Sequence, residues 1–138
     1  MENASPPSSA LPFALVVDDN SLIRMNAADI LEDAGFQTLE ASHVEEALSV
    51  LREHHPKIVL LFTDVQMPGE LDGFALARHT ATHWAHISIV VASGHVEPGP
   101  DDMPEGAHFI AKPFSADVVY HHLKQVVPDE RKPEPLKA

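Results

Sequence analysis

Short apolar runs alternate along the chain with longer segments in which apolar residues recur every three or four positions. The runs predict β-strands at residues 13–17, 37–41, 58–63, 88–93 and 108–111. The first, third and fourth runs are continuous apolar stretches, as expected of parallel strands that are buried on both faces. This alternation predicts an α/β fold in which helices cover both faces of a parallel sheet.

Helical periodicity and capping residues place the helices in the gaps between these strands. In the first helix, Ile23, Ala27 and Ile30 lie on one apolar stripe. The boundaries predicted from capping signals are Ser21 and Gly35 for the first helix, the Ser42 and Glu45 capping box for the second, Asp72 to Trp84 for the third, and Ser115 for the last.

The connection between the fourth and fifth strands departs from this pattern. It contains three prolines and three glycines between Ser93 and Phe109. Each proline in a helix interior costs about 3 kcal/mol and each glycine about 1 kcal/mol. We therefore expect an irregular Pro/Gly-rich loop in place of a fourth helix, with at most a single turn near residues 101–103. Such a loop is either a shortened connector or a surface for a partner protein.

The composition is typical of one compact domain. The chain has 138 residues, no cysteine and 44% apolar residues, enough for one core without disulfides. Residues 1–12 are rich in Ser, Pro and Ala, whereas residues 128–138 are charged and interrupted by proline. Neither segment offers a face that can pack, so we expect disordered tails at 1–12 and 128–138 around a single domain at 13–127.

The formal net charge of −12 argues against polyanionic partners. The sequence also has no basic stripe, no secretory signal and no apolar run long enough to cross a bilayer. We therefore expect a cytoplasmic protein that binds neither nucleic acid nor membranes.

Carboxylates stand where two predicted strands end. Asp18 and Asp19 follow the first strand, and Asp64 follows the third. Because ligands bind at the carboxyl ends of strands in open α/β sheets, these acids are expected to meet at one edge. Carboxylates within about 5 Å of one another repel by roughly 3 kcal/mol per pair at an effective dielectric of 20. A divalent cation with oxygen ligands, such as Mg²⁺, would offset this repulsion.

The motifs together resemble the phosphoacceptor receiver domain of two-component response regulators. They are Asp18-Asp19, Asp64 followed by Met67-Pro68, Asp72-Gly73, Ser93-Gly94 and Lys112-Pro113-Phe114. The resemblance covers roughly residues 12–127. It implies a flavodoxin-like, doubly wound, five-stranded parallel sheet of order 2-1-3-4-5.

The resemblance implies a role for each of these residues. Asp64 would accept a phosphoryl group, and Asp18, Asp19, Asp64 and the backbone carbonyl of Gln66 would hold Mg²⁺, with Asp19 rather than Asp18 making the more direct contact. Lys112 and the Ser93 hydroxyl would bind phosphoryl oxygens.

Further positions in the resemblance concern switching and phosphoryl lifetime. Gly94 would leave room for the phosphoryl group, although a turn glycine explains it equally well. Phe109 would rotate inward when Ser93 moves, or is simply a core aromatic. Gln66 and His95 would tune the attack of water on the acyl phosphate.

Two features depart from the family pattern or add to it. The stretch Glu70-Leu71 makes the loop after Asp64 one residue longer than usual, and the Pro/Gly loop puts the usual output surface in doubt. The resemblance also implies a cis Lys112-Pro113 peptide bond.

Ten histidines raise the question of a separate metal site. His79 and His83 stand four residues apart on a predicted helix, but no cysteine and no His-Glu-x-x-His motif accompanies them. Solvated helix faces explain these histidines better than a zinc site does. Their charge changes near pH 6.5, so mild acidification would remove much of the negative net charge.

The resemblance therefore implies a binding function rather than an enzyme, with Mg²⁺-dependent self-phosphorylation and dephosphorylation of Asp64 as the only chemistry. Since no second folded domain follows Val127, we expect a stand-alone receiver that takes its phosphoryl group from a histidine kinase or a histidine phosphotransfer protein. It would then dock to an unidentified downstream protein or relay the phosphoryl group onward. A phosphorylation-dependent dimer is a further alternative.

Two other classes are weighed against this interpretation. A small hydrolase of haloacid-dehalogenase type also forms an aspartyl phosphate, but it requires a second acid two places after its nucleophile, where Asn20 follows Asp18. A flavodoxin-like FMN binder would need a hydroxyl- and glycine-rich phosphate loop after the first strand, which the sequence lacks.

Overall fold

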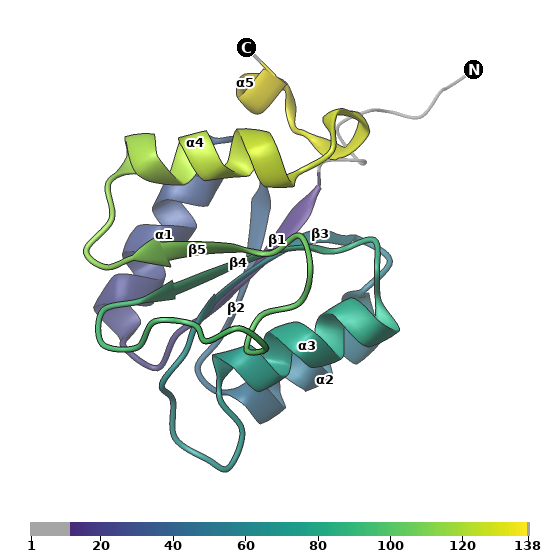
Figure 1. Ribbon diagram of the computed structural model, residues 1–138. Helices are drawn as coiled ribbons and strands as arrows, with labels where there is room; N and C mark the ends of the chain where they lie inside the picture. Colours follow the sequence, from purple (N-terminus) through teal and green to yellow (C-terminus); the bar gives the residue numbers. More distant parts are fainter. Residues whose placement is uncertain (1–11, 138) are drawn as a thin grey trace.

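A single five-stranded parallel sheet forms the centre of the molecule (Figure 1). The structure is a computed structural model and describes residues 12–137. The strand order is β2-β1-β3-β4-β5, which confirms the expected flavodoxin-like topology. The strands are β1 (Phe13–Val17), β2 (Gln37–Ala41), β3 (Ile58–Asp64), β4 (Ser88–Ser93) and β5 (His108–Ala111). The helices are α1 (Ser21–Asp33), α2 (Val44–His54), α3 (Gly73–His83), α4 (Ala116–Val126) and α5 (Glu134–Lys137), with a short 3₁₀ turn η2 (Asp129–Arg131).

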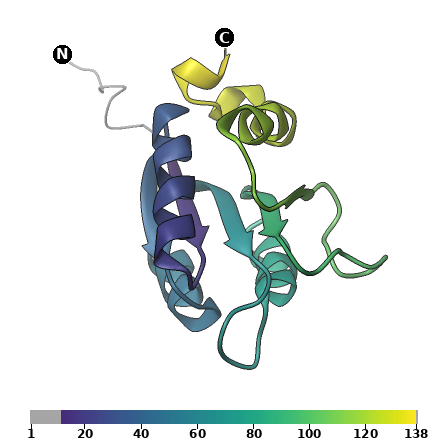
Figure 2. The same cartoon turned by 90° about the vertical axis from the view of Figure 1, so that its left-hand side faces the viewer.

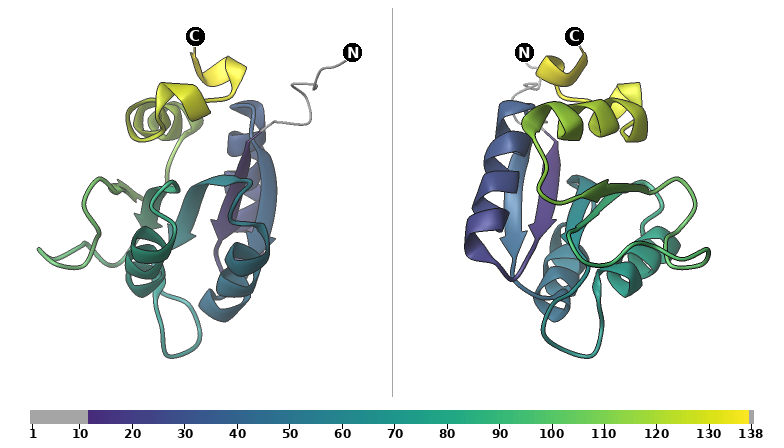
Figure 3. Two further views of the ribbon diagram at one scale, coloured as in Figure 1. Left: turned by 90° about the vertical axis from the view of Figure 1, so that its right-hand side faces the viewer. Right: turned by 60° about the vertical axis from the view of Figure 1, so that its left-hand side comes forward.

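Helices cover both faces of the sheet. The helices α1 and α4 lie on one side of the sheet and α2 and α3 on the other (Figure 3). One core cluster joins the strands to α1 and α4, and the other joins them to α2 and α3. Alternate residues of β3 serve the two clusters, since Leu60 and Phe62 face α1 and α4 while Leu61 faces α2 and α3. The central strand is therefore buried on both faces and ends at Asp64, one residue beyond the predicted end.

The connection from β4 to β5 contains no helix, as the prolines and glycines predict (Figure 2). Its turn lies at residues 100–102. The Asp102 carboxylate accepts a hydrogen bond from the Gly99 N–H at 2.7 Å, and the Asp102 carbonyl accepts one from Arg78 of α3 at 2.8 Å. The first bond closes the turn within the loop, and the second attaches the loop to α3 through the Arg78 side chain.

Two helices begin at residues other than those predicted. Asn20, not Ser21, caps α1, because its side-chain oxygen accepts hydrogen bonds from the Leu22 and Ile23 N–H groups. His43 caps α2, and the carboxylate of Glu46, not Glu45, reaches back to the N–H of Ser42 at 2.7 Å. Asp72 and Ser115 cap α3 and α4 as predicted.

The C-terminal segment differs from the disordered tail expected at 128–138. Residues 129–131 form η2 and residues 134–137 form α5, and the side chain of Leu136 is buried in the α1 and α4 cluster. Pro133 is also buried and lies against Gly35 at the end of α1. The prolines prevent a long helix but still supply apolar contacts. The tail expected at 1–12 lies outside the described residues except for Pro12, whose carbonyl accepts a hydrogen bond from Gln37.

Within residues 12–137, no helix has both the length and the apolar composition that crossing a membrane requires.

Candidate functional site

Asp64 is held at the end of the central strand. Its neighbours β1 and β4 pair with β3 up to Thr63 and Asp64 respectively, so the backbone here is fixed on both sides. After the connection that follows β3, the chain comes back to the end of this strand, where the Gly73 N–H at the start of α3 donates to the Val65 carbonyl at 2.8 Å. The Asp64 side chain is consequently almost buried, with 9% of the residue exposed.

The acidic pair follows β1 on the adjacent strand. Asp18 is buried, and its carboxylate accepts a hydrogen bond from the Asn20 N–H at 2.9 Å. Its backbone N–H donates to Ala41 of β2, and its carbonyl accepts from Arg24 of α1 at 2.8 Å. Asp19, by contrast, is exposed. The two acids therefore differ in environment: Asp18 is fixed by its neighbours, whereas Asp19 faces solvent.

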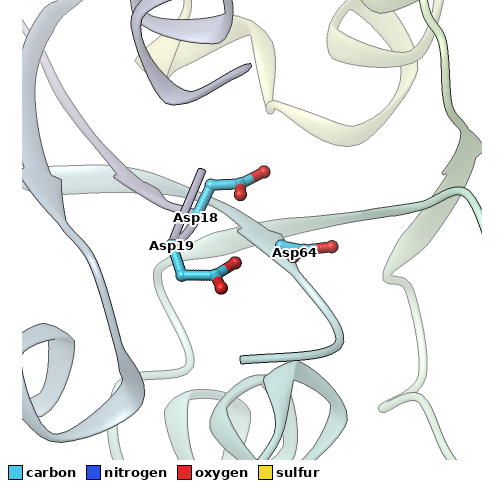
Figure 4. Close-up of side chains that lie close together, drawn as sticks. All are labelled: Asp18, Asp19 and Asp64. Atoms are coloured by element: carbon cyan, nitrogen blue, oxygen red, sulfur yellow. The ribbon is translucent and has the colours of Figure 1, made fainter. Parts of the chain in front are cut away.

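The three carboxylates meet at the edge of the sheet, as predicted from the strand ends. One oxygen of each of Asp18, Asp19 and Asp64 lies within 4.8 Å of the others. All three side chains point to the same side of the strand ends (Figure 4). Carboxylate oxygens at this spacing are suitable ligands for a hard divalent cation such as Mg²⁺.

Lys112, which follows β5, brings the compensating positive charge. Its ammonium donates to Asp18 Oδ2 at 2.8 Å and to Asp64 Oδ1 at 3.0 Å. Burial by itself would lower the pKa of Lys112, but the hydrogen bonds to these two carboxylates outweigh burial and raise it. Burial raises the pKa of Asp64, and the charge of Asp18 adds to this effect, whereas Lys112 opposes it. The peptide bond between Lys112 and Pro113 is cis, in agreement with the expectation.

The Ser93 hydroxyl lies at the end of β4 and is buried. It accepts hydrogen bonds from the backbone N–H groups of His95 at 3.3 Å and Val96 at 3.1 Å. Ser93 therefore connects the site to the first residues of the Pro/Gly loop. Gly94 is exposed, and a Cβ atom there would make an ordinary contact with the Lys112 side chain at 3.5 Å.

These groups surround an open cavity of about 560 Å³. Of the residues predicted for the site, Asp18, Asp19, Asp64, Gln66, Ser93, Gly94, His95 and Lys112 line it. Phe109 is not one of its lining residues. It packs, half-buried, against the α2 and α3 cluster instead. The β3–α3 connection, which carries the longer Glu70-Leu71 stretch, extends away from the sheet (Figure 2).

The sequence analysis missed one wall of the cavity. Asn20, Ile23 and Asn26 line it from α1. Their spacing of three residues places them on one helical face, a signal that was available from the sequence. Phe114 also lines the cavity and packs edge-on against Phe62 with ring centroids 5.5 Å apart.

Comparison with known proteins identifies the family to which this chain belongs. A family model described as the response regulator receiver domain matches residues 14–124. The chain belongs to the receiver domain family. Receiver domains act in two-component signalling with histidine kinases or phosphotransfer proteins and generally bind Mg²⁺ at an acidic pocket. The comparisons give no support to the hydrolase alternative.

Individual relatives agree with this assignment. The chain is 30% identical over 118 residues to the sporulation initiation phosphotransferase F of Bacillus subtilis, covering 83% of this chain and 92% of that protein. It is 34% identical over 112 residues to the C4-dicarboxylate transport transcriptional regulatory protein DctD of Rhizobium meliloti. That match covers 79% of this chain but only 24% of DctD, so the chain spans about a quarter of that longer relative.

A crystal structure of a response regulator receiver domain protein from Clostridium thermocellum superimposes with a TM-score of 0.72 at 30% identity, covering 84% of this chain and 94% of that one. The fold and the sequence therefore lead to the same family.

Proposed function

We propose that Asp64 accepts a phosphoryl group from a phosphohistidine of a histidine kinase or a histidine phosphotransfer protein. The observation that supports this is the convergence of Asp64, the acidic pair and Lys112 at one open cavity. A carboxylate oxygen of Asp64 attacks phosphorus, so that an O–P bond forms and the P–N bond to the donor imidazole breaks. The imidazole leaves with its electron pair and takes up a proton.

The residues around Asp64 have two proposed roles: some bind Mg²⁺, and Lys112 binds the phosphoryl group. Asp19, Asp64 and the Gln66 backbone carbonyl are the proposed Mg²⁺ ligands, with Asp18 supporting them, because Asp19 faces solvent while Asp18 is already bonded to Lys112 and Asn20. Bound there, Mg²⁺ would neutralise negative charge on the transferring group. Lys112 binds a phosphoryl oxygen as a point charge after the group has joined Asp64.

Ser93 provides the proposed link to the rest of the molecule. Its hydroxyl already accepts two hydrogen bonds from the loop, and its own proton is available for donation to a phosphoryl oxygen. Movement of Ser93 toward the phosphoryl group would pull on residues 94–96 and make room for Phe109 to rotate inward. Signalling then proceeds by contact with a downstream protein, by onward relay of the phosphoryl group or by dimerisation.

Intact-mass analysis tests the acceptor. After incubation with acetyl phosphate and Mg²⁺, the protein should gain the mass of one phosphoryl group, and D64N should gain none. Chelating the Mg²⁺ should abolish the gain in the parent protein. An equal gain in D64N would assign the acceptor to another residue and overturn the proposal.

Structures of the free and the beryllofluoride-bound protein test the switch. We expect the Ser93 hydroxyl to approach the beryllofluoride group and the Phe109 ring to turn toward the site. A Phe109 ring in the same position in both structures would show that Phe109 is a core aromatic and not part of the switch.

Substitutions of Gln66 and His95 test the control of phosphoryl lifetime. Both residues are exposed and line the cavity, where they can position or exclude an attacking water. Q66A and H95A should each change the rate of dephosphorylation while leaving phosphorylation of Asp64 intact. Equal lifetimes in the parent and in both variants would remove these residues from the mechanism.

A further inference from the structure

A second group of chemically active side chains lies toward the far end of α3. His79 and His83 stand one helical turn apart, and their rings are stacked with centroids 4.0 Å apart and planes inclined by 23°. His83 lies ten residues from the start of α3 at Gly73, which is about 15 Å along the helix axis. His79 lies six residues from Gly73, about 9 Å along the axis. Neither histidine is among the residues that line the acidic cavity, so the pair is separate from it.

The hydrogen bond of His83 fixes which of its nitrogens can bind a ligand. His83 Nδ1 lies 3.0 Å from the backbone carbonyl oxygen of His79. A carbonyl only accepts, so Nδ1 is the donor, and in the neutral form of the ring Nε2 is the nitrogen that has a lone pair for a metal. Donation of one ring N–H to a backbone carbonyl is the arrangement that orients histidines in metal sites.

The protonation of His79 also favours a ligand role. Burial lowers the pKa of His79, and the neighbouring His83 and Arg52 lower it further. The imidazole is therefore neutral at pH 7, and a metal binds only the neutral form. Arg52 has a second effect, because its positive charge opposes any bound cation.

We propose that His79 and His83 chelate a divalent transition-metal ion that prefers imidazole, such as Cu²⁺, Ni²⁺ or Zn²⁺. Two histidines at positions i and i+4 of a helix can present their nitrogens on one face, which is the spacing of helical zinc ligands. In the stacked arrangement the lone pairs of the two rings run nearly parallel, so binding one ion requires the rings to turn until a nitrogen of each faces the metal. Within residues 12–137, the only group with three His, Cys or acidic ligand atoms within 4.8 Å of one another is Asp18, Asp19 and Asp64. The histidine site therefore offers two protein ligands and leaves the other positions to water. The proposal is an alternative to the expectation that these histidines are only a solvated face.

Trp84 is a built-in reporter for this site. It is the single tryptophan of the chain, and its ring centroid lies 5.7 Å from that of His79 and 5.8 Å from that of His83. Cu²⁺ or Ni²⁺ bound by the pair should quench its fluorescence. The experiment is a titration of the full chain with Cu²⁺ in excess Mg²⁺, which occupies oxygen ligands and does not compete for imidazole.

Saturable quenching at one equivalent of Cu²⁺ is the expected result. H79Q and H83Q should each raise the half-quenching concentration about tenfold or more, as losses of metal-site residues do. R52Q should lower it, because it removes the opposing charge. H121Q, on α4, is the matched control and should titrate like the parent.

A competing ligand near Trp84 must be distinguished from the pair. The His55 ring also stacks on Trp84, with centroids 5.5 Å apart. Quenching that H55Q abolishes, or that H79Q and H83Q leave unchanged, would overturn the proposal. Circular dichroism of each variant establishes that it is folded, and the hyperfine pattern of bound Cu²⁺ in electron paramagnetic resonance counts the coordinating imidazole nitrogens independently of fluorescence. Two nitrogens support the chelate, and one or none contradicts it.

Discussion

At the scale of single residues, the acidic site holds like charges close together in a poorly solvated place. Asp64 is nearly buried beside Asp18, and Lys112 is the cation bonded to both. Burial and the Asp18 charge raise the pKa of Asp64, so its ionised form is less favourable in the folded protein than in the unfolded chain. The ionised acid therefore opposes folding at neutral pH. A cation bound at the site relieves this repulsion.

The substitution D64N should for this reason stabilise the protein at neutral pH without Mg²⁺. The folded-state pKa of Asp64 is raised, so the penalty develops as pH rises through that pKa and is complete above it. D64N removes the penalty and leaves Lys112 paired with Asp18, and we expect a gain on the order of 1 kcal/mol in the free energy of unfolding. Denaturant titration at pH 7 measures it.

Asp72 provides a matched control for this prediction. It caps α3 from an exposed position, and asparagine caps a helix about as well as aspartate, so D72N should leave stability nearly unchanged. Adding Mg²⁺ should stabilise the parent protein more than D64N, because a ligand that binds the folded state stabilises it. A D64N protein less stable than the parent would show that the Asp64–Lys112 ion pair outweighs the repulsion.

The main charged residues of the site could be predicted because strand ends fix where they lie. Asp18, Asp19 and Asp64 follow apolar runs, and parallel strands bring such positions to one edge, whereas the place of Lys112 was implied by the family resemblance. The hydrogen bonds that Ser93 accepts from the loop could not be predicted, since they depend on the path of an irregular backbone. The sequence also does not predict the bond from the Asn20 N–H to Asp18, nor that Asn20 rather than Ser21 caps α1, because both residues have side chains that can cap a helix.

At the scale of elements, the strands and the principal helices follow from apolar periodicity, while two short features do not. Proline and glycine correctly predict the absence of a helix between β4 and β5. Proline content does not predict the structure at η2 and α5, because such short helical turns tolerate prolines. Leu136 of α5 is buried in the core. The local sequence could not reveal the burial of Leu136, because the residues of α1 and α4 that share its core cluster are distant from it in the sequence.

The junction of β3 and α3 depends on a glycine. A Cβ atom on Gly73 would overlap the backbone carbonyl oxygen of Asp64. G73A must therefore shift either the start of α3 or the end of β3, and we expect it to lower the free energy of unfolding by about 1–3 kcal/mol. It should also slow phosphorylation of Asp64. Thermal unfolding and intact-mass kinetics measure the two effects.

Gly94 supplies the comparison for G73A. A Cβ atom there would make only an ordinary contact with Lys112, so G94A should retain the stability of the parent. Equal stability of G73A and the parent protein would mean that the junction adjusts without cost, contrary to the packing argument.

The C-terminal segment should contribute to stability through Leu136. Its side chain is buried, so L136A should cost about 2–5 kcal/mol if the surrounding core cannot close the cavity. K137A, the exposed neighbour, is the control and should have little effect. Urea unfolding of both variants gives the difference. An L136A protein as stable as K137A would show that α5 is not held to the core in solution.

At the scale of the whole molecule, acidic charge and histidines together make the protein sensitive to mild acid. The net charge of −12 counts the ten histidines as neutral, so protonating them changes the overall charge considerably. The effect of protonating a given histidine on stability depends on the groups that this histidine contacts. His122 of α4 and His108 of β5 have Nδ1 atoms 3.0 Å apart, a hydrogen bond that needs at least one of these nitrogens to be unprotonated.

The contribution of these histidines to stability should consequently fall as the pH drops below about 6.5, whereas protonation of Asp64 acts in the opposite direction because its pKa is raised. Burial lowers the pKa of His122, and His108 and His121 lower it further, while His79 is shifted in the same direction. Below pH 6.5 the unfolded chain therefore takes up more protons than the folded protein, and the free energy of unfolding decreases until the folded-state pKa is passed. Urea titrations between pH 7.5 and about 5 measure the slope. H122Q should flatten it, and H108Q should flatten it in part, because removing this neighbour raises the pKa of His122. Identical slopes in the parent and both variants would exclude the histidine pair as a source of the pH dependence.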